Sequence, residues 1–184
     1  HPEVHARLTK LAARHNATMQ QEFDTYRDRP FTVGYAPATT LPARDGIPRG
    51  TIIRSSKAPN NSFFKNWTSE DDAITWSIDV GETGEYEATV HYTCAEKNLG
   101  TTIQLAMERG DKTTAPVTIA FNPPLYDKSM ERMANSHYFV KDFQALDLGS
   151  LHLEKGRGQL RLTATNIIGQ LAIDVHSVEL VRKP

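Results

Sequence analysis

Apolar and polar residues alternate along most of the chain, from about Thr51 to the C-terminus. Between Ile74 and Val80, and again between Tyr86 and Cys94, every second residue is apolar and most residues between are polar. A strand with this period of two buries one face and exposes the other. Eight or more short segments of this kind predict a mostly β fold, an antiparallel β-sandwich or jelly roll. Further segments of this kind lie at 103–107, 117–121, 139–143, 151–153, 160–164 and 171–181.

A different period governs the N-terminal segment. Apolar residues recur every three or four positions from Val4 to Tyr26, which predicts one amphipathic helix from about Pro2 to Arg27. A lone helix is marginal in water, so we expect its apolar face to dock on the β-domain or on a missing partner. Residues 31–59 are rich in proline and glycine and are predicted to form an extended connector. We therefore divide the chain into a lead-in at residues 1–50 and a sandwich at residues 51–184.

Two irregularities interrupt the strand pattern. The last segment has apolar residues at Leu171, Ile173 and Val175 and then changes phase, which predicts a β-bulge near His176–Ser177. A long polar segment, NPPLYDKSMERMANS, separates Phe121 from His137. Loops of this length are uncommon inside a compact domain and are often functional.

Composition excludes several classes of protein. Formal net charge is -1, so nothing favours nucleic acid or an anionic membrane as a partner. No apolar run approaches the roughly 20 residues that span a bilayer. Cys94 is the single cysteine, which excludes an internal disulfide. The chain begins with His1 and Pro2 and carries no signal peptide, and we expect it to be part of a larger protein.

No catalytic constellation is visible in the sequence. Cys94 lies on the inward face of its predicted strand, which favours a buried structural thiol over a nucleophile. Asp174 and His176 are two residues apart and could chelate a metal, and Asp71–Asp72 could offer oxygen ligands to calcium, but a solvated face and an acidic turn are the commoner explanations. No G-x-S-x-G elbow is present. Carboxylate pairs are too numerous to single one out without geometry.

Carbohydrate binding is a further candidate chemistry. It needs an exposed aromatic ring beside side chains that form hydrogen bonds. Trp67, which follows Asn66 in NNSFFKNWTS, either stacks on a sugar or caps the sandwich, whereas the phase of Trp76 places it in the core. Tyr126 is the second aromatic candidate, and Lys128 and Arg132 near it could contact an anionic group such as a sulfate. An ordinary solvated loop is the commoner explanation for these last three residues.

Several segments resemble a known family. The stretch HPEVHARLTKLAARHNATMQQEF resembles the final helix of type I sulfatases. The segments RPFTVGYAPATTLPARDG, APNNSFFKNWTSEDDAITWSIDV and YFVKDFQALDLGSLHLEKGRG resemble the C-terminal extension of bacterial arylsulfatase-like proteins. The C/S-x-P-S-R motif of the family is missing, because Cys94 is followed by Ala95-Glu96-Lys97. The resemblance therefore carries over no catalytic residue, and it implies a tail of a secreted or periplasmic hydrolase.

The β-part also looks like galactose-binding-like and carbohydrate-binding jelly rolls. That resemblance implies a structural calcium ion with Asp174, near the last strand, as one ligand. The partner acidic residues expected in the first strand are not evident in GTIIRSSKAP.

Four hypotheses follow from the residues and the resemblance together. The first is a non-catalytic accessory module that packs on a sulfatase-like catalytic domain and helps to hold a sulfated polysaccharide. The second is an autonomous carbohydrate-binding module. The third is an assembly module whose helix forms an oligomer interface, and the fourth is an independent hydrolase with a carboxylate pair.

Overall fold

A computed structural model describes residues 1–26, 29–57, 62–108, 110–126 and 141–184 of this chain. These residues form two compact units, His1–Pro30 and Phe31–Pro184, which are described separately. None of the helices in the described residues is both long and apolar enough to cross a membrane.

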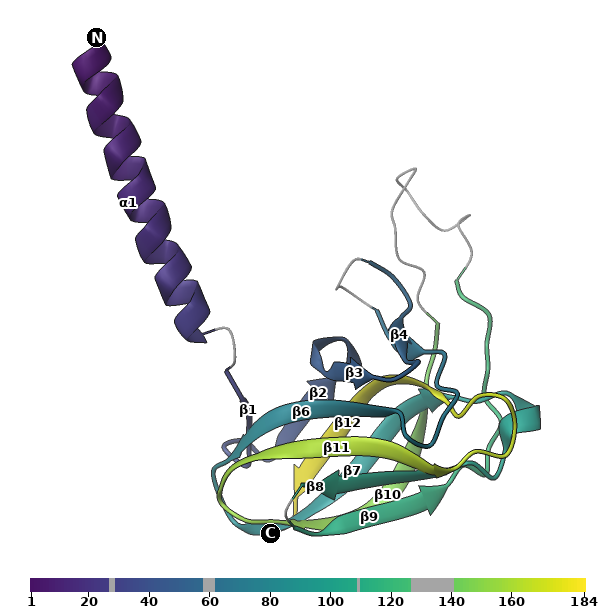
Figure 1. The fold of residues 1–184 in the computed structure, drawn as a ribbon. Coiled ribbons are helices and arrows are strands. Elements are labelled where there is room, and N and C mark those ends of the chain that lie inside the picture. The colour runs from purple at the N-terminus through teal and green to yellow at the C-terminus, as the bar shows by residue number, and fades with distance from the viewer. Residues whose placement is uncertain (27–28, 58–61, 109, 127–140) are drawn as a thin grey trace. The chain divides into compact units, whose positions relative to one another are not determined.

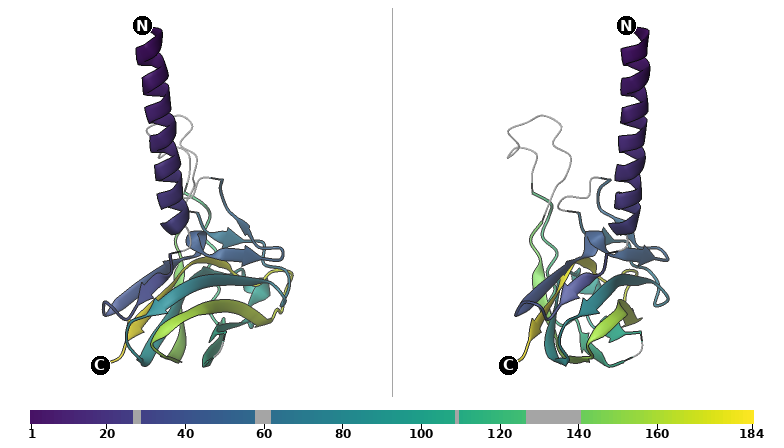
Figure 2. Two further views of the ribbon diagram at one scale, coloured as in Figure 1. Left: turned by 60° about the vertical axis from the view of Figure 1, so that its left-hand side comes forward. Right: turned by 90° about the vertical axis from the view of Figure 1, so that its left-hand side faces the viewer.

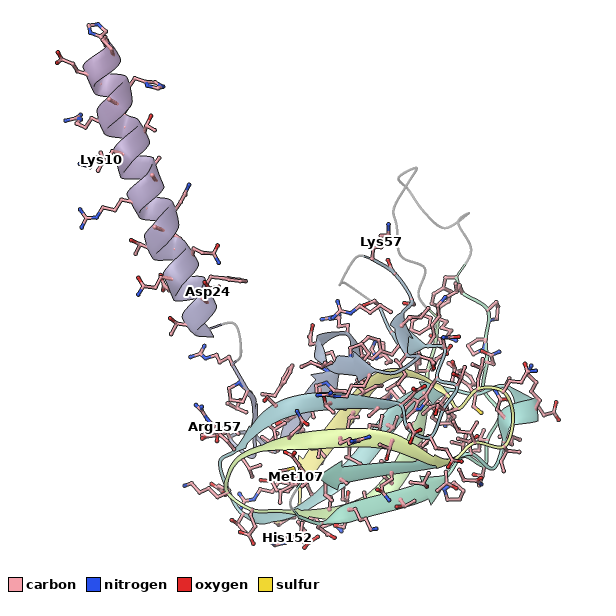
Figure 3. The ribbon with its side chains drawn as sticks, viewed as in Figure 1. Lys10, Asp24, Lys57, Met107, His152 and Arg157 are labelled. Atoms are coloured by element: carbon pink, nitrogen blue, oxygen red, sulfur yellow. The ribbon has the colours of Figure 1, made fainter. Side chains whose placement is uncertain are left out.

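The first unit is one helix, α1, from Pro2 to Tyr26, as the apolar spacing predicts. Pro2 suits the first turn because the N–H that it lacks has no partner inside a helix, and Glu3 complements the positive end of the helix dipole. The apolar stripe is exposed: Val4, Leu8, Leu11, Met19 and Phe23 keep between 47% and 63% of their surface accessible. Side chains such as Lys10 and Asp24 project outward along the helix (Figure 3).

The second unit is a sandwich of two sheets (Figure 1). The first sheet has the order β9-β8-β11-β6, and β1 and β3 both pair with the outer edge of β6. Its strands are β1 Phe31–Val33, β3 Ile47–Arg49, β6 Ala73–Val80, β8 Thr102–Met107, β9 Lys112–Pro116 and β11 Gly156–Asn166. All its described pairs are antiparallel except β1–β6.

The second sheet has the order β10-β7-β12-β5-β4, and β2 pairs with a further stretch of β12. Its strands are β2 Ala38–Pro42, β4 Ile53–Arg54, β5 Phe64–Lys65, β7 Gly84–Thr93, β10 Gln144–Leu153 and β12 Asp174–Arg182. Two short 3₁₀ helices, η1 Ala43–Asp45 and η2 Glu96–Asn98, lie in the connections. Figure 2 shows the two layers from the side.

The core lies between the sheets, where the alternating pattern places it. Ile74, Trp76 and Ile78 of β6 face Tyr86 and other inward residues of β7, and each of these four is at most 1% exposed. Burying one such side chain stabilises the fold by about 1.5–3 kcal/mol. The mostly β sandwich predicted from the period of two is therefore confirmed, and so is the core position of Trp76.

Residues 31–50 belong to the sandwich, whereas the sequence predicts that they are part of the lead-in. The boundary between the units lies after Pro30, twenty residues before the predicted boundary after Gly50. Pro42 and Pro48 are compatible with strands here, because each lies in a strand at the edge of a sheet, where a missing N–H costs no interior hydrogen bond. The proline-rich segment therefore covers the edges of β6 and β12 instead of connecting two domains.

The strand predicted at 117–121 is wrong. The chain forms β9 at Lys112–Pro116 instead, and Ile119 is 55% exposed. Only a single bridge joins Cys94 to Phe121 in this stretch. The segment predicted at 139–143 lies partly outside the described residues, and the strand there, β10, begins at Gln144.

The predicted bulge is confirmed. The register between β12 and β7 slips between Val175 and Ser177, so His176 is the extra residue. Because of this slip, Val175 before the bulge and Val178 after it are both buried in the core.

Candidate functional site

The antiparallel pairing brings the loops together at two opposite ends of the sandwich. At one end, which we call the loop end, lie residues 62–72, 94–101, 117–126, 141–143 and 167–173. At the other, which we call the turn end, lie residues 34–37, 81–83, 154–155 and 182–184. Figure 3 labels His152 and Arg157 on the two strands that the 154–155 turn joins. Each candidate site is placed at one of these ends.

Trp67 is not a sugar platform. Its side chain is 1% exposed, and its indole Nε1 donates a hydrogen bond to the carbonyl of Ser69 at 3.0 Å. The carbonyl of Trp67 accepts a hydrogen bond from the N–H of Ala172 at 2.8 Å, so its backbone is tied to the segment before β12. Of the two roles predicted for Trp67, the structure supports the one in which the ring caps the sandwich, because a ring with no accessible face cannot stack on a ligand.

Asn66 has a structural role in the described fold. It adopts a left-handed backbone conformation, with φ of 63°, which asparagine tolerates better than most residues. Its side-chain amide donates to the carbonyl of Thr51 at 2.8 Å, and its own carbonyl accepts from the Thr51 hydroxyl at 2.9 Å. These two hydrogen bonds join the turn at residue 51 to the loop before β6.

Asp72 completes the same junction. Its carboxylate is 2% exposed and accepts hydrogen bonds from Thr51 N–H (3.0 Å), Thr51 Oγ1 (2.5 Å), Ser69 N–H (3.1 Å) and Thr68 N–H (3.3 Å). Burial alone would raise the pKa of Asp72, but these hydrogen bonds outweigh burial and hold the pKa below its ordinary value of 3.8. Because both oxygens are already engaged, the carboxylate is poorly placed to bind calcium.

Tyr126 is exposed at the loop end. Its ring keeps 47% of its surface accessible, and its hydroxyl donates a 2.6 Å hydrogen bond to Oδ1 of Asp142. This hydrogen bond raises the pKa of the Tyr126 phenol, which keeps it protonated at neutral pH. The bond fixes the ring at its polar tip and leaves ring surface free for a ligand. Lys128 and Arg132, which the sequence groups with Tyr126, lie outside the described residues.

Asp174 lies beside a lysine. The Lys141 ammonium, on a side chain that is 7% exposed, is 2.7 Å from Oδ2 of Asp174 and 3.5 Å from Oδ1 of Asn122. Thr93 Oγ1 donates to the same Asp174 oxygen at 3.3 Å. The ammonium occupies the position that a cation ligated by this oxygen would need. Because the ammonium holds this oxygen, Asp174 does not fit the calcium site that the resemblance implies. In the part of the chain that the structure describes, no group of three His, Cys, Asp or Glu side chains is placed to hold a metal ion.

His176 does not join Asp174 as a metal ligand. Its ring packs on Phe143, with centroids 4.8 Å apart, and its Nδ1 lies 3.3 Å from the hydroxyl of Ser177. Burial lowers the pKa of His176, which favours the neutral ring in this stack. Phe143 also contacts Phe63 edge to face, so the histidine is part of a small aromatic cluster at the loop end.

One cleft among the described residues of the loop end is too small for a sugar. It measures about 100 Å³ and is lined by residues that include Cys94, Asn98 and Asp174. Small-molecule sites usually measure about 300–1,000 Å³. Burial raises the pKa of the Cys94 thiol, which is 2% exposed, so the predicted structural role of this cysteine is supported.

The turn end holds a larger cleft, which the sequence analysis missed. It measures about 440 Å³ and is lined by Gly34, Tyr35, Ala36, Pro37, Glu82, Arg182, Lys183 and Pro184. Tyr35 is 66% exposed, which makes it more accessible than Tyr126. The signal in the sequence is the Gly-Tyr-Ala-Pro segment at 34–37, which lies inside the predicted connector.

Comparison with known proteins gives matches in structure and none in sequence families. No model of a known protein family matches the chain, and no curated protein sequence matches it. Among solved structures, the chain resembles the CBM35 module of Abf62 from Cellvibrio japonicus, with 18% identity and a TM-score of 0.55 over 80% of this chain and 94% of that module. It also resembles a family 35 carbohydrate binding module from Clostridium thermocellum, with 12% identity and a TM-score of 0.51 over 80% of this chain and all of that module.

Parts of two larger proteins have a similar fold. The GH26-CBM35 β-(1,4)-mannanase of Podospora anserina matches with 13% identity and a TM-score of 0.54, and the Cry4Aa toxin of Bacillus thuringiensis with 11% and 0.60. This chain covers 80% of its own length in the first match and 84% in the second, but spans only 28% and 25% of those proteins. The likeness therefore shows a β-sandwich like that of carbohydrate-binding modules. The toxin shows that this fold alone does not identify a ligand.

Proposed function

We propose that this chain is a carbohydrate-binding module that holds a glycan and does not cleave it. The observation that carries the proposal is the exposed, hydrogen-bonded ring of Tyr126 on a sandwich like that of two family 35 carbohydrate binding modules. Each of those modules is covered over at least 94% of its length, so the likeness extends to a whole module.

The Tyr126–Asp142 pair provides both kinds of contact that a sugar needs. The aromatic face binds the apolar C–H face of a pyranose ring, and tyrosine combines an apolar body with a polar tip. The Asp142 carboxylate, which is exposed, can accept further hydrogen bonds from sugar hydroxyls. Because the hydroxyl is already bonded to Asp142, less rotamer freedom is lost when a ligand binds.

A sulfated glycan is the ligand class that the resemblance to arylsulfatase-like proteins favours. Lys128 and Arg132 follow Tyr126 closely in the sequence, and cations near the ring would pair with sulfate groups. No comparison supports a sulfatase-like parent, so this part of the proposal rests on the resemblance and on these two basic residues of the sequence. Dextran and dextran sulfate share a backbone, so comparing them isolates the effect of the sulfate groups. We expect the chain to bind dextran sulfate more strongly than dextran at 150 mM salt.

The absence of catalysis is part of the proposal. Cys94, the one thiol, is buried with a raised pKa, and buried thiols of this kind are inert. We expect no turnover of aryl sulfates or aryl glycosides by the purified chain. Turnover that survives purification to homogeneity would favour the hydrolase hypothesis.

The exposed stripe of α1 supports a role as an accessory to another domain. Five large apolar side chains on one helix are rarely left in water. We propose that the stripe docks on a sulfatase-like catalytic domain, in a secreted or periplasmic protein, as the resemblance implies. Self-association through the helix is the alternative, and a concentration-dependent mass in analytical ultracentrifugation would favour it.

The binding proposal is tested by calorimetric titration of the 184-residue chain with neutral and sulfated polysaccharides. Tyr126→Ala is expected to weaken binding about tenfold, which corresponds to the 1.4 kcal/mol typical of an aromatic anchor. Tyr126→Phe is the matched control, since it keeps the ring and loses only the hydrogen bond to Asp142. Absence of binding to every polysaccharide would overturn the proposal, and equal loss in both variants would assign the effect to the hydroxyl.

A further inference from the structure

The Tyr35 ring is a preformed aromatic platform at the turn end. Its ring lies against the backbone of Gly81: a Cβ atom at Gly81 would come within 2.7–2.9 Å of three ring atoms. Because glycine has no side chain, the Tyr35 ring can pack directly on the turn between β6 and β7. One side of the ring is packed while 66% of the residue remains exposed, so the ring is positioned and also accessible.

The turn that carries Tyr35 is fixed on both sides. Gly34 has a φ of +77°, and a Cβ there would lie 2.1 Å from the hydroxyl oxygen of Tyr86. Tyr86 in turn donates a 2.7 Å hydrogen bond to the carbonyl of Glu82, and Gly81 N–H donates to the carbonyl of Val33 at 2.8 Å. The 34–37 turn and the 81–83 turn are thus locked together, and the platform needs little ordering when a ligand binds.

The polar groups of the cleft are arranged in charge-compensated pairs. The Arg182 guanidinium pairs with the Glu82 carboxylate, and the Lys183 ammonium lies 3.4 Å from the Glu87 carboxylate. The backbone N–H of Arg182 donates to the carbonyl of Pro37 at 2.9 Å, which holds the end of β12 against the Tyr35 turn. A fixed donor and a fixed acceptor therefore lie in the same cleft as an exposed ring.

We infer that this cleft is a second saccharide site, and that it takes a neutral sugar. The inference rests on the proposed function of glycan binding. Its volume of about 440 Å³ lies in the range of small-molecule sites. A carboxylate accepts hydrogen bonds from hydroxyl groups and a guanidinium donates them, so the Glu82–Arg182 pair matches the hydroxyls of a pyranose stacked on Tyr35. An anionic sugar gains little here, because each basic side chain of the cleft already lies beside a carboxylate.

Two sites at opposite ends of the sandwich would let one chain contact two glycan segments at once. The Tyr126 ring belongs to the loop end and the Tyr35 ring to the turn end, and the strands of the sandwich separate them. Binding of a polymer to both sites raises the overall affinity above that of either site alone. This predicts cross-linking of long polysaccharides, which a module with one site does not produce.

The test is calorimetric titration of the 184-residue chain with neutral oligosaccharides, namely β-1,4-mannohexaose, β-1,3-galactotriose and isomaltotriose. Tyr35→Ala is expected to remove one of two binding events, or to weaken binding about tenfold where the events are not resolved. Tyr35→Phe retains the ring and is expected to bind like the wild type. Gly81→Ala, which displaces the ring without altering Tyr35, is expected to weaken binding as well. Thermal denaturation of each variant checks that the fold is retained.

The outcomes separate the second site from the proposed function. Binding by the wild type that is unchanged in both Tyr35→Ala and Gly81→Ala overturns the second site and leaves the function intact. Binding that falls in both variants and persists in Tyr126→Ala supports the turn-end cleft directly. Absence of any saccharide binding by the wild type overturns both. Stronger binding of dextran sulfate than dextran that disappears in Tyr35→Ala overturns the assignment of a neutral ligand.

Discussion

Replacing Asp72 with asparagine tests whether this carboxylate is a structural junction. The carboxylate accepts four hydrogen bonds, three of them from backbone N–H groups of Thr51, Thr68 and Ser69. An asparagine that keeps its oxygen at the Oδ2 position retains three of these as weaker, neutral bonds and turns an NH₂ group toward Thr51 N–H. Hydrogen bonds to charged groups contribute about 1 kcal/mol more than neutral ones, and an unsatisfied buried donor costs about 1–3 kcal/mol.

The expected decrease in the free energy of unfolding is about 3 kcal/mol. This value is lower than the sum of the contributions above, because Thr51 is exposed and water can replace part of its lost hydrogen bonding. For a domain of this size, that loss lowers Tm by roughly 6–12 °C. Urea denaturation followed by circular dichroism measures the free energy, and calorimetry measures Tm. Asp71→Asn is the matched control. The Asp71 carboxylate is exposed, so this substitution is expected to change the free energy of unfolding by no more than about 0.5 kcal/mol.

The pH dependence gives an independent check. The pKa of Asp72 in the folded state lies below its ordinary value of 3.8, so this group binds a proton more readily in the unfolded state. Its contribution is therefore fully present above pH values near the unfolded pKa and is lost as pH falls through the folded pKa. Asp72→Asn should show a smaller loss of stability than the wild type between neutral pH and this acidic range. A loss below about 1 kcal/mol at neutral pH would contradict the structural role, as would a calcium-induced rise in Tm that Asp72→Asn abolishes.

Three further predictions concern the core, the loop end and the helix. Trp67→Ala should destabilise the fold by about 3–5 kcal/mol. Wild-type tryptophan emission should resist quenching by acrylamide and stay unchanged when a glycan is added, because Trp67 and Trp76 are each 1% exposed. A change in emission on glycan binding would place Trp67 in the binding site. Lys141→Met should cost about 2–4 kcal/mol by leaving Asp174 without its ammonium, adding Asp174→Asn should recover part of that loss, and calcium should not change the Tm of the wild type. If calcium raises that Tm, the lysine does not replace a metal ion. A chain of residues 31–184 should keep the thermal transition of the full chain, because the sandwich is a compact unit of its own; a large drop in Tm would show that the helix stabilises it.

The sequence predicts the fold well where one periodic signal dominates. The period of two from Ile74 to Val80 identifies β6 and the core position of Trp76, and the phase change after Val175 locates the bulge at His176. These signals are strong because a slip of one residue would turn a whole buried face to water.

The rest of the fold depends on tertiary contacts that no local pattern encodes. The five short strands described between Phe31 and Lys65 have at most five residues each, and two of them, β2 and β3, contain proline. Four of them, β1, β2, β3 and β5, form by pairing with β6 or β12. Whether Trp67 stacks or caps is decided by the segment around Ala172, which is more than a hundred residues away.

The two candidate sites also differ in how far the sequence predicts them. Tyr126 could be predicted because a tyrosine in a long polar loop is expected to be exposed. Tyr35 could not, because its role depends on Gly81 and on the Glu82–Arg182 pair, which the strand pairing brings together from three separate segments.

The most direct test of the central claim is binding of the 184-residue chain to an array of neutral and sulfated glycans. The account predicts saturable binding to at least one glycan class, weakened by Tyr126→Ala and by Tyr35→Ala and retained by the phenylalanine variant at each position. The contradictory result is a folded chain, verified by its thermal transition, that binds no glycan on the array.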